Sequence, residues 1–132
     1  SDGRIINISF DIEVFINESF NKSEISASII SVVEEFMNIN NKTMNENIYL
    51  GKLIETITNV PGVINLLRIV SYNKVGEGKY SLNEISQSLK NNNTREIDTP
   101  DQVIWGEPSS MFEIRNINKD VKIFVKSGRI SI

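Results

Sequence analysis

The most constraining feature of the sequence is a run of strict alternation near its start. Apolar side chains occupy every second position over residues 6–16, and Asn7, Ser9, Asp11 and Glu13 stand between them. A period of two is the signature of a β-strand, whose successive side chains point to opposite faces of a sheet. The apolar face of this strand comprises Ile6, Ile8, Phe10, Ile12, Val14 and Ile16. The chain must therefore build a sheet, and another layer must cover one of its faces.

Two amphipathic helices are predicted to form that layer. The first lies in residues 25–36, where apolar side chains recur at the spacing of one helix face. The second lies in residues 50–57 and has the same spacing. The two apolar stripes are Ile25, Ile29, Val32, Val33 and Phe36, and Leu50, Leu53, Ile54 and Ile57. Pro61 disfavours a helical conformation at Val60, so the second helix should end before it, and Gly62 is expected to provide the geometry of the following turn.

Three further strands are expected in the second half of the chain. Residues 63–72 carry apolar side chains on both faces, which indicates a central strand or one covered from outside this domain. A polar, irregular excursion follows over residues 81–110. Order returns with two segments of alternating pattern, residues 112–115 and 121–126, and Asn118 to Asp120 is predicted to be the turn between them.

This order of elements predicts the fold class α+β. The expected architecture is a two-layer sandwich, a mainly antiparallel sheet with two helices on one face and the order β-α-α-β-excursion-β-β. A chain of 132 residues has the usual size of one domain, so residues 1–132 are expected to form a single domain. Because the chain does not begin with Met and enters a strand-like pattern within a few residues, we expect it to be a piece of a longer protein.

Composition argues against several classes of function. The chain has no histidine and no cysteine, which excludes Ser-His-Asp and Cys-His relays and thiolate metal sites within it. A net charge of -3 argues against binding nucleic acid through its phosphates. No apolar run approaches the roughly 20 residues that span a bilayer, so no membrane association is expected. We expect no enzyme activity, no cofactor, no metal and no small-molecule substrate.

The glycine-rich stretch NKVGEGKYS, residues 73–81, invites comparison with phosphate-binding loops. A P-loop requires GxxxxGK[ST], but Gly76 precedes Gly78 and Lys79 by only two positions, and Tyr80 stands in the Ser/Thr place. The dinucleotide pattern GxGxxG fails too, because Ser81 replaces its third glycine. Gly76 and Gly78 are therefore predicted to supply positive φ in a tight turn after a strand.

Carboxylates offer the remaining catalytic or metal-binding alternative. A pair of acids could hydrolyse glycosides if two of them met in a pocket. The candidates are Asp11, Glu13, Glu34, Glu35, Asp98 and Asp101. The run Asp98 to Asp101 could also bind a hard cation through oxygen ligands, although Asp and Pro are ordinary turn residues.

Four large apolar residues are candidates for contact with a partner. Trp105, Met111 and Phe112 lie around a Gly-Glu-Pro turn, and Phe124 lies among polar neighbours in the last strand. Aromatic residues and Met are enriched in the cores of protein interfaces. For Trp105 a second interpretation remains open, in which the indole folds back over the edge of its own sheet.

Several segments together resemble a known family. The features are a Leu-Gly step into a helix (Leu50, Gly51), a V-x-G-V hairpin (Val60 to Val63), an apolar strand ending in Tyr72-Asn73, a glycine turn into Tyr80-Ser81 and a closing S-M-F-E-I segment (Ser110 to Ile114). In this order they resemble the C-terminal part of baseplate wedge proteins of T-even-like contractile-tailed phages, in the wider baseplate J group. The resemblance spans nearly the whole chain and departs from the family pattern between Ser81 and Asp98.

The resemblance implies that the chain is the C-terminal fragment of a longer structural protein and that it has no catalytic residues. Its expected partners are copies of itself and other wedge subunits, which build the ring around the tail hub. It further implies a location in the virion tail baseplate, and in the host cytoplasm during assembly. The alternative is a small-ligand-binding or regulatory α+β domain without catalysis, in which the turn at Gly76 to Tyr80 or the run Asp98 to Asp101 binds a nucleotide or cation.

Overall fold

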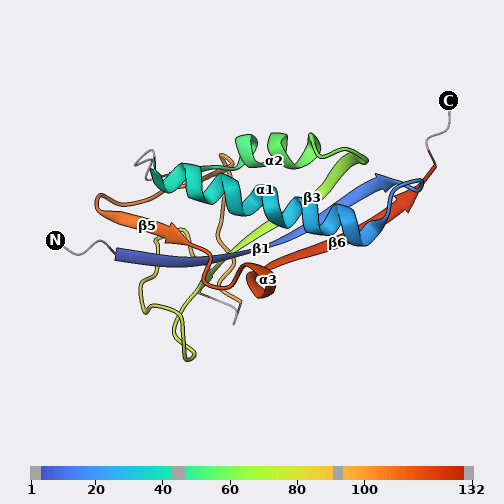
Figure 1. Cartoon of the computed structure of the whole chain (residues 1–132). Helices are drawn as coiled ribbons and strands as arrows, with labels where there is room; N and C mark the ends of the chain where they lie inside the picture. The colour runs from blue at the N-terminus through green and yellow to red at the C-terminus, as the bar shows by residue number, and fades with distance from the viewer. Residues whose placement is uncertain (1–3, 43–46, 91–93, 130–132) are drawn as a thin grey trace.

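The computed structural model describes residues 4–42, 47–90 and 94–129 (Figure 1). The elements follow the order β1 (Arg4–Asn17), α1 (Lys22–Lys42), β2 (Ile48–Tyr49), α2 (Leu50–Thr58), β3 (Val63–Lys74), β4 (Val103–Ile104), β5 (Ser110–Glu113), α3 (Ile117–Asp120) and β6 (Val121–Gly128). The alternating segment at the start of the sequence thus forms the longest strand, β1.

Strand β1 lies at the centre of the main sheet. It pairs antiparallel with β3 on one side, over residues 7–16, and parallel with β5 and β6 on the other. β5 covers residues 4–7 of β1 and β6 covers residues 10–17, so the two strands follow one another along the same side of β1. A second, two-stranded sheet joins β2 and β4.

The connection between β5 and β6 differs from the turn predicted at Asn118 to Asp120. These residues belong to the short helix α3, which bulges out of the sheet before the chain returns in the same direction. A tight turn would reverse the direction of the chain. The single helical turn of α3 instead lets the chain leave the sheet and rejoin it, so β6 runs in the same direction as β5. Among the described residues, Ile8 and Ser9 of β1 therefore pair with β3 alone.

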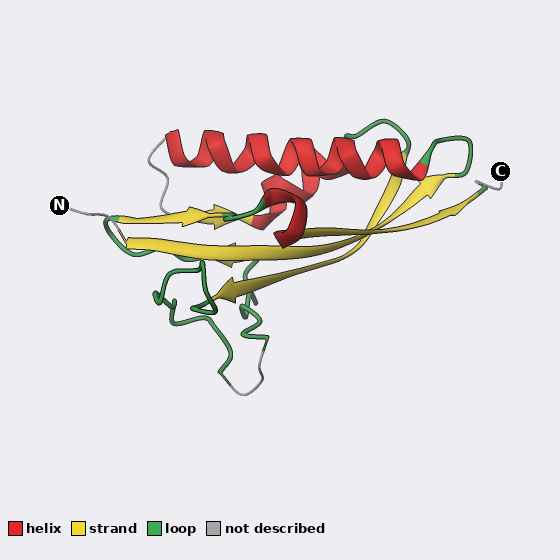
Figure 2. Cartoon of the chain, turned by 60° about the horizontal axis from the view of Figure 1, so that its bottom comes forward, coloured by secondary structure: helices red, strands yellow, loops and turns green. Residues whose placement is uncertain are grey.

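Helices α1 and α2 cover one face of the main sheet, as Figure 2 shows. α1 packs over β5 and β6, and α2 packs over β3. The core between the layers contains the apolar face of β1 and the inward stripes of both helices, including Ile29, Val33 and Leu53, all fully buried. The predicted α+β sandwich with its two main helices on one face is confirmed. No helix within the described ranges is long and apolar enough to cross a membrane.

The excursion covers part of the opposite face (Figure 2). Its backbone pairs with the outer edge of β3, where Asn73 N–H donates to the carbonyl of Arg95 and Ile97 N–H to that of Ser71. Ile85 and Ile97 are buried, so the excursion contributes to the core despite its polar sequence. Asn7 is buried beneath it and accepts a hydrogen bond of 2.7 Å from the Ser81 N–H.

The two-sided apolar pattern of β3 has a local cause. The pairing of β1 with β3 shifts register between Glu13 and Val14 and again between Phe15 and Ile16. Leu67 and Ile64 are the residues of β3 left without a partner at these bulges, and both side chains are exposed. β3 is therefore not a central strand along residues 63–70, because within the described chain β1 is its only partner strand there.

Candidate functional site

The four interface candidates do not share one environment. Trp105, Met111 and Phe124 are 49%, 44% and 44% exposed. Phe112 is only 1% exposed, because its position in β5 opposite Ile6 turns its ring into the core beneath α1. The prediction that Phe112 contacts a partner is therefore wrong, since a fully buried ring offers no contact surface.

Met111 and Phe124 share the face of the sheet that the helices leave open. Met111 stands opposite Ile5 of β1, and Phe124 stands opposite Glu13, eight residues further along. At a rise of about 3.3 Å per residue, these positions are about 26 Å apart. Met111 and Phe124 therefore do not belong to one patch, and the surface around Phe124 is a separate end of this face.

We call that end the open-face patch. Register and alternation place six residues there: Glu13, Phe15, Arg68, Val70, Phe124 and Lys126. The Arg68 guanidinium lies 6.0 Å from the centre of the Phe124 ring, and the Lys126 amino group lies 3.3 Å from the Glu13 carboxylate. The patch thus combines apolar rings with charges of both signs, a composition typical of protein contact surfaces.

Both edges of the main sheet border this patch. Within the described chain, β6 pairs only with β1, and β3 has no outer partner along residues 63–70. Unpaired edges present backbone donors and acceptors to another chain. Lys122 and Lys126 on β6 place charge at this edge, which disfavours indiscriminate pairing.

A groove also lies on the helix side, between α1 and α2. It has a volume of about 320 Å³ and is lined chiefly by Val32, Phe36, Ile39 and Tyr49. Ile39 and Tyr49 are exposed although both are large and apolar. The sequence pattern did not identify this groove, because Tyr49 belongs to a two-residue strand and Ile39 lies beyond the predicted helix.

The predicted glycine turns have the expected backbone. Gly62, Gly76 and Gly78 have φ values of 94°, 66° and 83°, which L-residues rarely adopt. A Cβ at Gly62 would lie 2.6 Å from Phe20 and 2.8 Å from Ile25, whereas a Cβ at Gly78 would meet nothing within 4 Å. Gly62 is thus required by φ and by packing, and Gly78 by φ alone.

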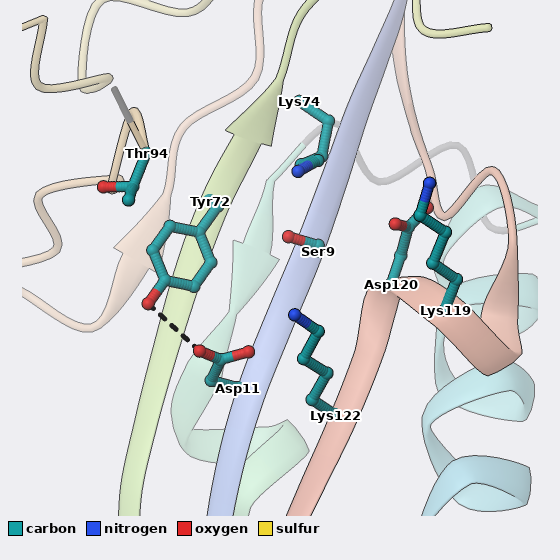
Figure 3. A pocket seen from close by; sticks show the side chains of 8 residues that line it. All are labelled: Ser9, Asp11, Tyr72, Lys74, Thr94, Lys119, Asp120 and Lys122. Atoms are coloured by element: carbon teal, nitrogen blue, oxygen red, sulfur yellow. Dashed lines mark hydrogen bonds between the residues drawn. The ribbon is translucent and has the colours of Figure 1, made fainter. Parts of the chain in front are cut away.

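A charged hollow, which we call the lysine pocket, lies where β5 leaves the sheet and β6 joins it (Figure 3). Its volume is about 310 Å³. Eight residues line it: Ser9, Asp11, Tyr72, Lys74, Thr94, Lys119, Asp120 and Lys122. They come from β1, β3, the excursion, α3 and β6, so the interruption of the edge strand by α3 creates the space between them.

The two carboxylates of this pocket are held by tyrosine hydroxyls. Tyr72 donates to Asp11 over 3.2 Å, and Tyr80 donates to the buried Asp120 over 2.7 Å. Burial, with the Asp120 hydrogen bond and charge, raises the pKa of Tyr80 to about 12. The pKa of Tyr72 is also raised, by burial first and then by the charge of Asp11. Both phenols therefore remain donors at neutral pH.

The carboxylate candidates are otherwise dispersed. Glu34 and Glu35 lie exposed on α1, and Asp98 and Asp101 lie exposed in the excursion. Asp11 and Asp120 line one pocket, and Glu34 and Glu113 line a smaller one of about 100 Å³. In each pair only one acid, Asp11 or Glu34, was a candidate. Over residues 4–42, 47–90 and 94–129, no cluster of three or more acids could hold a metal ion.

Apart from Asp11, the residues of the lysine pocket were not candidates, because no local motif contains them. Lys74 and Lys119 are 45 positions apart, and only the tertiary fold brings them together. The available signal was alternation, since Ser9 and Asp11 occupy the polar face of β1 and Lys122 the polar face of β6. A scan against protein-family models finds no matching family, and a search of curated proteins finds no match.

Proposed function

We propose that the chain is an assembly domain of a baseplate wedge subunit of a contractile-tailed phage, as the resemblance in its sequence implies. It binds copies of itself and neighbouring wedge subunits, has no catalytic role, and functions in the tail baseplate of the virion after assembly in the host cytoplasm. The observation that carries the proposal is the open-face patch, bordered by two strand edges that pair with no further strand of the described chain.

The physical argument concerns apolar surface that the fold leaves in water. Phe124, Leu67 and Ile64 are exposed near one end of the sheet, and Phe15 and Val70 are only partly buried. Burial of apolar area contributes about 25 cal/mol per Å². Folding leaves these side chains in contact with water, so a partner that covers them would stabilise the complex by burying this area. The neighbouring charges on Arg68, Glu13 and Lys126 supply orientation.

Light scattering coupled to size exclusion tests the proposal on the full chain. We expect the average mass to rise with protein concentration, and Phe124→Ser to shift this rise to higher concentration by tenfold or more. Leu82→Ser is the matched control, because Leu82 is 83% exposed and lies in the excursion away from the patch. A chain that stays monomeric at high concentration, alone and with other wedge subunits, contradicts the proposal.

A further inference from the structure

We propose that the lysine pocket binds a phosphate group. The groups that would hold it are the ammonium groups of Lys74 and Lys122 and the hydroxyl of Ser9, with Lys119 at the rim. This inference does not depend on the proposed function, because it rests on different residues, near the middle of the open face. The proposal concerns binding alone and includes no reaction of the bound phosphate.

The first observation is that three ammonium groups border one hollow without a carboxylate partner. Lys74, Lys119 and Lys122 form no ion pair within 4 Å with any described residue, although the chain carries 17 acidic residues. Asp11 and Asp120 line the same pocket, and each accepts a hydrogen bond from a tyrosine hydroxyl, which leaves its negative charge in place. Three lysines and two carboxylates give the lining a formal net charge of +1, and the ammonium groups are not held by these carboxylates.

The second observation is the Ser9 side chain. Ser9 is only 8% exposed, and its hydroxyl makes no hydrogen bond to any described residue. Figure 3 shows this hydroxyl directed into the pocket, with the amino groups of Lys74 and Lys122 extending into the space around it. The hydroxyl is open to the space of the pocket, so it can donate a hydrogen bond to an acceptor bound there.

The arrangement of donors favours a tetrahedral oxyanion over a planar one. Lys74 approaches from β3, Lys122 from β6 and Ser9 from β1 between them. Donors that converge from three elements match the three or four oxygens of phosphate better than the two coplanar oxygens of a carboxylate. A volume of about 310 Å³ lies at the lower end of ligand pockets, which suits inorganic phosphate or a small phosphomonoester. The net charge of -3 disfavours a polyanion as the source of the phosphate.

The test is a titration of the full chain with inorganic phosphate, followed by ¹H–¹⁵N NMR at constant ionic strength. We expect saturable shifts of the amide signals of Ser9, Lys74 and Lys122. Lys74→Gln and Lys122→Gln should each weaken binding about tenfold, as expected for the loss of one charge-assisted hydrogen bond. Ser9→Ala should weaken it about threefold while preserving the near-UV circular dichroism of the fold.

The matched control is Lys22→Gln, which removes the same charge from an exposed position at the start of α1. Binding to this variant should equal that of the unmodified chain. Glycerol 3-phosphate identifies the source: tighter binding of the ester assigns the pocket to an organic phosphate, and tighter binding of free phosphate assigns it to the inorganic ion. The proposal is overturned if chloride reproduces the shifts, if acetate binds as tightly as phosphate, or if Lys22→Gln weakens binding as much as Lys122→Gln.

Discussion

At the scale of single residues, Tyr80 links the glycine turn to the rest of the molecule. The turn closes through the Gly76 N–H, which donates to the Ser81 carbonyl, and the Tyr80 N–H, which donates to the Gly76 carbonyl. This geometry directs the Tyr80 hydroxyl onto Asp120, and the Lys74 amino group lies 5.4 Å from the centre of the Tyr80 ring. The turn therefore positions a side chain, in addition to reversing the backbone.

The raised pKa of Tyr80 predicts a loss of stability at alkaline pH. The folded state holds the phenol protonated up to about pH 12, whereas an unfolded tyrosine ionises near pH 10. The contribution is therefore fully present below about pH 10 and is lost as pH rises to about 12. Chemical unfolding of the chain and of Tyr80→Phe between pH 8 and 12 measures it. The difference between the two free energies of unfolding should shrink across pH 10 to 12, and a constant difference would contradict the assignment.

The glycines predict a graded series of substitutions. Gly78→Ala should cost about 1–2 kcal/mol, because its strain comes from positive φ alone. Gly62→Ala should cost more, since the new Cβ would also collide with Phe20 and Ile25. Gly51→Ala in α2 is the control and should stabilise by up to about 1 kcal/mol, because its nearest neighbour atom is 3.8 Å away. Urea unfolding gives the order, and equal costs for Gly62→Ala and Gly78→Ala would refute the packing argument.

Sequence reasoning at this scale succeeded where the cause is local. The positive φ of Gly76 and Gly78 followed from residue type and position after a strand. The burial of Phe112 did not, because alternation in a four-residue strand cannot show which face the helices cover. Asp120 was assigned to a turn, and its contacts with Tyr80 and the Asn116 N–H depend on the tertiary fold.

At the scale of elements, the interrupted edge strand determines where the surface is hollow. β5 and β6 both run parallel to β1, and α3 leaves the sheet between them. The alternation of residues 112–115 and 121–126 predicted two strands, but a single helical turn between them carries too little pattern to be distinguished from a tight turn. The sequence likewise did not show whether β5 and β6 run parallel or antiparallel to one another, because this depends on whether the connection between them reverses the chain.

The packing of α1 predicts which of its isoleucines matters. Ile29 faces the sheet and is fully buried, whereas Ile39 is exposed beside the groove between α1 and α2. Ile29→Ala should lower the free energy of unfolding by about 2–5 kcal/mol, as for other large-to-small core substitutions. Ile39→Ala, the matched change on the same helix, should stay within about 0.5 kcal/mol. Thermal unfolding by circular dichroism measures both, and similar losses would show that the inward face of α1 has been misassigned.

At the scale of the whole molecule, the two faces of the sheet have different coverings. The helices cover one face and bury the inward side chains of β1 completely, while the excursion covers only the end of the other face that contains Asn7 and Asn73. The excursion thereby leaves the open-face patch at one end and borders the lysine pocket near the middle. The α+β class was predictable because long periodic segments carry it, whereas the path of the excursion depends on hydrogen bonds such as those of Asn73 with residues 83, 85 and 95.

This architecture predicts a gradient of local stability. β1 is paired on both sides over residues 10–16 and forms the centre of the core, so the amides of this part should exchange with solvent only when the whole molecule unfolds. Described amides at the tip of the glycine turn, such as those of Gly78 and Lys79, lie exposed and should exchange through small local openings. Native-state hydrogen exchange by NMR measures both free energies. The value for Ile12 should equal the global free energy of unfolding, and Ile85, although in the excursion, should be well protected because it is buried and its N–H donates to the Asn73 side chain. If Ile85 exchanged as fast as Gly78, the excursion would be an appendage of the sheet and not part of its cooperative unit.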